Sequence, residues 1–180
     1  MENTYIIIGI IVILFIIVLI QYNKIVKLKM KVKQSKSGID VYCQQRFDLI
    51  PNLVETVKGY TSYEKETLER ITELRTRFKE TKDLKIGEEL NNKLNTIIAV
   101  AENNPDLKAS EQFLNLQKNL SKVESQLQAA RRIYNTDVTN YNTKIHIVPF
   151  NIIATIFRFK DADLFQIEDS KVRNNIDVNF

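Results

Sequence analysis

The chain has 180 residues, with 26 Lys and Arg against 22 Asp and Glu, a formal net charge of +4, and one cysteine. A single cysteine excludes an intramolecular disulfide framework. Four glycines, three prolines and no tryptophan leave little turn material for a β-fold, so we expect an all-α protein.

The first predicted element is an apolar helix near the start of the chain. Fourteen of the sixteen residues in Tyr5–Ile20 are Ile, Val, Leu or Phe. A helix from Thr4 to Tyr22 is about 28 Å long at 1.5 Å per residue, close to the ~30 Å hydrocarbon thickness of a bilayer. A secretory signal peptide would need a basic start and a small-residue cleavage site, and the sequence has neither. We therefore predict an uncleaved, single-pass transmembrane anchor and a short external N-terminus in residues 1–22.

A basic helical stalk, residues 23–38, is predicted next. Its lysines precede the first acid after the anchor and are Lys24, Lys27, Lys29, Lys31, Lys33 and Lys36. The positive-inside rule places them and all later residues in the cytoplasm, under the cell membrane. Setting aside these six lysines and Glu2 leaves 20 basic against 21 acidic residues. We therefore expect the lysines to contact anionic headgroups, and we expect no nucleic acid partner.

Apolar spacing predicts that long helices continue to about His146. The first continues from the membrane to about Tyr60, with a kink or break near residues 48–51, because Pro51 deprives the Phe47 carbonyl of its hydrogen bond. A second helix is predicted to about Lys82, opened by a Thr61–Glu64 capping box. A charged linker over residues 82–87 and a third helix over residues 88–103 follow.

The clearest helix is predicted from about Ser110 to His146. Aromatic and Leu residues recur there every seven positions, at Phe113, Leu120, Leu127, Tyr134 and Tyr141. This is the buried stripe of a helix in a bundle. We predict that residues 39–160 form an up-and-down four-helix bundle with long helices, followed by a tail over residues 161–180 whose last part is frayed.

The apolar segment of residues 148–159 has two interpretations. It could touch the bilayer, because Lys144, Arg158 and Lys160 would then lie near the lipid headgroups. Alternatively, Ile152, Ile153, Ile156 and Phe157 could close the bottom of the bundle. The sequence leaves the choice open.

Little in the sequence indicates catalysis. His146 and Cys43, the only histidine and cysteine, lie on different predicted helices, and a buried free cysteine is the simpler interpretation. Di-iron Glu-x-x-His motifs, Gly-rich phosphate loops and G-x-S-x-G are absent from the sequence. We therefore expect neither an enzyme nor a bound metal or cofactor.

Polar residues in or beside the apolar stripes are the candidate site instead. They are Arg46, Asp48, Arg75, Glu102, Glu124, Arg131, Tyr134, Asn135, Tyr141 and Asn142. A near-core arginine requires an acidic partner, for which Glu102 and Glu124 are candidates. These groups either fix helix register, which we favour, or line a polar groove for a partner.

Three segments resemble the signature stretches of the LemA family of single-pass bacterial membrane proteins: Arg46–Tyr60, Ala101–Leu120 and Ala130–Asn142. Two residues depart from the family pattern: Asn104, where an aromatic residue is expected, and Arg158, where a small one is common. The resemblance implies a helical bundle and no assigned chemistry.

Three functions fit this sequence. The favoured one is a membrane-tethered interaction or scaffold module with a protein partner of unknown identity. The alternative is a self-assembling, membrane-shaping or pore-like complex, which leaves homo-oligomers open. An adaptor in membrane-protein quality control is suggested by the family context alone.

Overall fold

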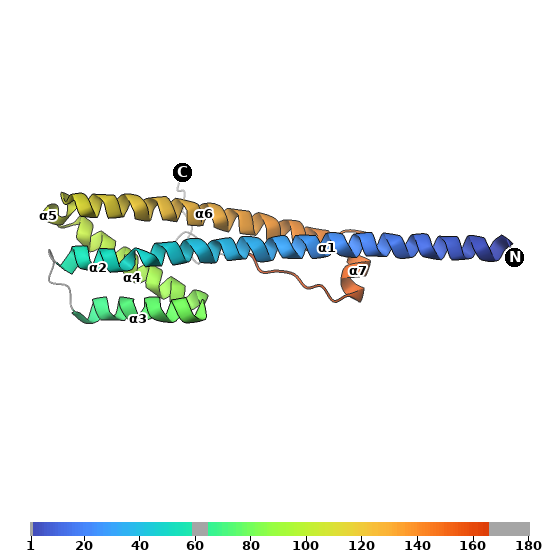
Figure 1. The fold of residues 1–180 in the computed structure, drawn as a ribbon, viewed down its shortest axis with the longest axis horizontal. Coiled ribbons are helices and arrows are strands. Elements are labelled where there is room, and N and C mark those ends of the chain that lie inside the picture. Colours follow the sequence, from blue (N-terminus) through green and yellow to red (C-terminus); the bar gives the residue numbers. More distant parts are fainter. Residues whose placement is uncertain (1, 59–64, 166–180) are drawn as a thin grey trace, which may run out of the picture. The chain divides into compact units, whose positions relative to one another are not determined.

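The computed structural model describes residues 2–58 and 65–165, and every regular element within them is an α-helix (Figure 1). The elements are α1 (Glu2–Asp48), α2 (Ile50–Lys58), α3 (Lys65–Thr81), α4 (Leu84–Glu102), α5 (Pro105–Lys108), α6 (Glu111–His146) and α7 (Phe150–Ile156). The all-α prediction is confirmed. The capping box at Thr61 and Glu64 and the frayed end of the tail lie outside the described residues.

The chain forms two compact units. Of the described residues, 2–33 and 133–165 make up one, here called the terminal unit, and 34–58 and 65–132 make up the other, the central unit. The long helices α1 and α6 each contribute residues to both. The boundaries expected at residues 22, 38 and 160, and the up-and-down order of four helices, stay predictions.

The N-terminal part of α1 is apolar and uncovered. Every side chain of Tyr5–Ile20 is exposed, and within the described residues α1 contains the one stretch that is long and apolar enough to cross a membrane. Exposed isoleucines, valines and leucines in such a row are unfavourable in water and favourable in hydrocarbon.

The core of the terminal unit joins three helices. Ile25 and Val32 come from α1, while the other buried members are Val138, Tyr141, Ile145, Phe150, Ile153 and Ala154 from α6 and α7. The sequence predicts that residues 133–160 belong to a bundle that begins at residue 39. In the structure, buried residues of this segment share a core with Ile25 and Val32 of the stalk. Of the four residues expected to close the bundle, Ile153 is buried, whereas Ile152, Ile156 and Phe157 are exposed.

The core of the central unit follows the predicted heptads. Phe113, Leu116 and Leu120 of α6 are buried together with residues from the end of α1 and from α2, α3, α4 and α5. α1 ends at Asp48 and α2 begins at Ile50. The predicted break beside Pro51 is therefore confirmed.

Two connections in the central unit differ from the prediction. The charged linker was expected to reach Gly87, but α4 begins at Leu84, and the Gly87 amide donates to the Asp83 carbonyl at 3.0 Å in its first turn. The glycine is needed for packing, because a Cβ there would lie 2.8 Å from the buried Phe78 ring. The short helix α5 was not predicted. Its N-cap is Asn104, whose side chain accepts hydrogen bonds from the Asp106 and Leu107 amides.

The two helical glycines Gly38 and Gly87 give opposite predictions. Alanine is favoured over glycine inside a helix by about 1 kcal/mol, and a Cβ on Gly38 would meet nothing within 4 Å, so Gly38→Ala should stabilise the protein. At Gly87 the same change overpacks the core against Phe78, which typically costs about 1 to 3 kcal/mol. Chemical denaturation should show Gly87→Ala to be destabilising. Equal stabilisation by both changes would contradict the packing at Phe78.

Candidate functional site

Arg75 supports the break between α1 and α2. Because Pro51 has no N–H, the Phe47 carbonyl lacks its intrahelical donor. Arg75 Nε, from α3, donates to this carbonyl oxygen at 3.0 Å, and Arg75 Nη2 donates to Asp48 Oδ1 at 3.1 Å. The structure therefore pairs two of the predicted polar residues, Arg75 and Asp48, and Arg75 also binds the carbonyl that the proline leaves unsatisfied.

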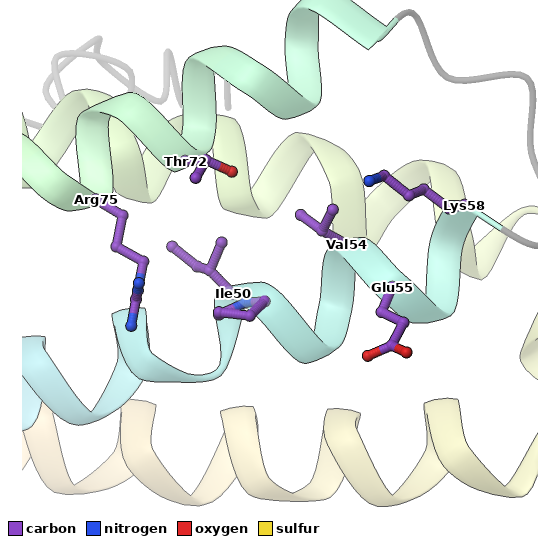
Figure 2. A pocket seen from close by; sticks show the side chains of 7 residues that line it. Ile50, Val54, Glu55, Lys58, Thr72 and Arg75 are labelled. Carbon is purple, nitrogen blue, oxygen red and sulfur yellow. The ribbon is translucent and has the colours of Figure 1, made fainter.

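A shallow cavity of about 320 Å³ lies beside this break, between α2 and α3. Its lining is mostly apolar and consists of Ile50, Pro51, Val54, Glu55, Lys58, Thr72 and Arg75. Ile50 and Val54 point from α2 toward Thr72 on α3, and Arg75 reaches from α3 toward the start of α2 (Figure 2). Among the sequence-predicted residues only Arg75 lines this cavity. Apolar spacing in the sequence places Ile50 and Val54 on a helix. It does not show that a cavity lies between α2 and α3 beside these two residues.

A second polar group of the central unit is centred on Arg46. Arg46 is 6% exposed, forms an ion pair with Glu124 and donates to Asn95 Oδ1 at 2.8 Å. Glu102, the other acid expected to pair with an arginine, instead accepts from Gln117 Nε2 at 2.6 Å. Burying the guanidinium is tolerable here because the acid and the amide bind its two terminal nitrogens. Its Nε is buried and has no hydrogen-bond partner among the described residues.

Cys43 belongs to the same neighbourhood. Burial raises the pKa of the Cys43 thiol above its ordinary value, and the charge of Arg131 opposes that rise. A thiol with a raised pKa stays protonated at neutral pH and is a poor nucleophile. Cys43 therefore has the environment of a packed side chain, as the sequence predicts.

The Tyr–Asn pairs of α6 bind a backbone segment of the terminal unit. We call Tyr134, Asn135, Tyr141 and Asn142 the Tyr–Asn ladder. Asn142 Nδ2 donates to the Ala162 carbonyl and its Oδ1 accepts from the Ala162 amide, both at 2.9 Å. Asn135 makes the same pair of bonds with Phe165, at 3.0 and 2.8 Å.

The two tyrosines complete the ladder with one hydrogen bond each. Tyr141 donates to the Lys160 carbonyl at 2.9 Å and Tyr134 donates to the Asp163 carbonyl at 2.8 Å. Burial raises the pKa of both phenols, so they stay protonated and keep donating.

The seven-residue spacing of the ladder matches the segment that it holds. Seven helical residues rise about 10.5 Å, and three residues of extended chain cover about 10 Å. Asn142 and Asn135 accordingly bind Ala162 and Phe165, and Tyr141 and Tyr134 bind Lys160 and Asp163. Residues 161–165, the first part of the predicted tail, are thus held on α6. His146, at the end of that helix, adds a contact to Asp161 at 2.9 Å.

Arg75 and Pro51 should be energetically coupled. Arg75→Met removes the donor to the Phe47 carbonyl, and losing a charged hydrogen-bond partner typically costs about 1.5 to 3 kcal/mol. Pro51→Ala restores an N–H able to reach that carbonyl, so the same Arg75→Met change should cost less in this background. A double-mutant cycle by chemical denaturation measures the coupling. Strictly additive free energies would show that Arg75 does not compensate for Pro51.

Asn142→Ala should release the segment around Ala162. The change removes both hydrogen bonds to that residue, so hydrogen exchange of peptides covering residues 159–165 should become faster. Asn140→Ala is the matched control, because Asn140 lies on the same helix and is exposed. Mass spectrometry gives the exchange rates. Equal rates in both variants would mean that the ladder does not hold the segment.

Comparison with known proteins agrees with this architecture. The family model described as "LemA family" matches residues 35–180. The chain is 24% identical over 165 residues to Protein LemA of Metamycoplasma hominis, covering 84% of this chain and 75% of that protein. It is also 24% identical over 178 residues to Magnetosome proteins MamQ 1 and MamQ 2 of Paramagnetospirillum magneticum, covering 82% of this chain and 65% of each relative. With its exposed apolar N-terminal helix, this membrane-associated protein belongs to the LemA family.

Proposed function

We propose that the protein is a membrane-anchored interaction module that offers the α2–α3 cavity to a protein partner and catalyses no reaction of its own. The observation that carries the proposal is this cavity, with its apolar floor and charged edge. The anchor would hold it at the inner face of a bacterial membrane, where its partner would be another membrane or membrane-bound protein.

The orientation follows from the charges next to the anchor. All six stalk lysines are exposed on α1, and such a cluster favours the cytoplasmic side, where it can also contact anionic headgroups. A cysteine at Asn3 in a Cys43→Ser background should react with an impermeant thiol reagent on intact cells. Protection of that cysteine until the cells are lysed would reverse the orientation.

The lining of the cavity suits binding better than catalysis. Pro51 and Val54, beside the buried Ile50, provide an apolar surface for one side chain of a partner. Lys58 at the edge favours a neighbouring carboxylate, whereas Arg75 already pairs with Asp48. The Thr72 hydroxyl already donates to the Leu68 carbonyl at 3.0 Å. We therefore propose an apolar anchor residue flanked by an acid as the feature that the partner presents.

Photo-crosslinking at two threonines of α3 tests the proposal. A benzophenone amino acid replaces either Thr72, which lines the cavity, or Thr76, one turn further along the helix. The two positions are matched, because both are exposed and each hydroxyl donates to the carbonyl four residues earlier at 3.0 Å. In cells, irradiation should yield a protein adduct from position 72 and little from position 76.

The composition of the adduct also shows whether the partner is a different protein or a second copy of this chain. A heterologous adduct supports the interaction module, whereas an adduct between two copies of the chain supports self-assembly. If Thr72 gives no adduct in a chain that is folded and in the membrane, the cavity is not the contact surface.

A further inference from the structure

The helix α7 leaves one apolar face uncovered. Phe150, Ile153 and Ala154 are buried in the core of the terminal unit, but Val148, Ile152 and Ile156, spaced four residues apart, are 76%, 58% and 67% exposed. Phe157 is also 51% exposed. Ile152 and Ile156, one turn apart in α7, lie on one side of the helix, opposite the side that packs, and Val148 comes just before its first turn.

This face lies beside the end of the apolar run of α1. The ring of Phe157 contacts that of Tyr22 on α1, with ring centroids 4.8 Å apart, and Tyr22 is two residues beyond Ile20, the last residue of the apolar run. Tyrosines concentrate at the membrane interface. Figure 1 shows α7 running across the direction of α1, as a helix lying in the plane of the interface would.

The charges around α7 also fit a lipid surface. Residues 147–157 contain no charged side chain, whereas Lys144 precedes them and Arg158 and Lys160 follow. Lys29 Nζ lies 5.6 Å from the centre of the Phe159 ring, beside the same end of α7. An apolar segment flanked by cations matches acyl chains beneath anionic headgroups.

We infer that α7 inserts its exposed face into the bilayer that the anchor spans, as a second membrane contact at the boundary between headgroups and acyl chains. Interfacial helices lie about 5 to 10 Å below the surface. The inference goes beyond the proposed function, which needs one anchor, and it rests on that anchor being in the membrane.

The absence of tryptophan from the chain allows a direct test by single-tryptophan fluorescence. The full chain is reconstituted in vesicles of phosphatidylglycerol and phosphatidylcholine, with and without bromine on the acyl chains of the phosphatidylcholine. Ile152→Trp reports on α7. Ile133→Trp is the matched control, because Ile133 is also 58% exposed and lies about 20 Å from the end of α6 at 1.5 Å per residue.

Ile152→Trp emission should shift to the blue in vesicles and be quenched by the brominated lipid, while Ile133→Trp emission should be neither shifted nor quenched. Quenching by bromine requires contact with the acyl chains, so a blue shift without quenching would indicate a protein surface as the occupant and overturn the inference. Unshifted and unquenched Ile152→Trp emission would overturn it as well.

Phe15→Trp separates the failure of the inference from the failure of membrane anchoring. Phe15 lies within the apolar run and is 62% exposed, so a spanning α1 places it among acyl chains. Quenching of Phe15→Trp without quenching of Ile152→Trp rejects the α7 contact and keeps the anchor. Absence of quenching at both positions rejects membrane anchoring itself.

Discussion

The central unit depends on one backbone carbonyl that has lost its donor. The long helix α1 has to end where its apolar residues would no longer pack in the core. Pro51 fixes the position of that end, because it lacks the N–H that would continue the helical hydrogen bonds. An unsatisfied carbonyl near the core is costly. Arg75 donates to the Phe47 carbonyl from α3, and this hydrogen bond fixes the register of α3 against the end of α1. The cavity between α2 and α3 lies beside this hydrogen bond.

The terminal unit solves a different problem, which is how to hold chain that has no regular structure. Residues 157–165, the part of the chain after α7 that the structure describes, form no helix, so their amides and carbonyls need partners from elsewhere. Four side chains of α6 supply them. The same helix packs Val138, Tyr141 and Ile145 into the core, so Tyr141 contributes its ring to the core and its hydroxyl to the ladder.

How far the sequence predicts this structure depends on the range of the interactions. The helix content, the α6 stripe and the break at Pro51 follow from periodicity and proline chemistry, which act within one or two turns. The Arg75 bond joins residues 28 positions apart, and nothing in the local pattern of α3 indicates its acceptor. Gly87 resembles linker material because glycine is a poor helix former, and the Phe78 ring that requires it is visible only after α3 and α4 pack. The Tyr–Asn pairs are recognisable at seven-residue spacing, but the backbone that they bind carries no signal in its own sequence.

The ladder recognises its segment by peptide groups and not by side chains, and this has an evolutionary consequence. Amides and carbonyls are the same for almost every residue, so the exposed Lys160, Asp163 and Leu164 can change identity with little effect on how the ladder holds them. Asp161, which contacts His146, and Ala162, which packs against the core, are more constrained. Proline is the exception at positions 162 and 165, whose N–H groups both bind an asparagine oxygen. Natural selection could therefore vary the side chains that this segment displays to solvent, including Asp163 and Leu164, while the four residues of α6 stay unchanged.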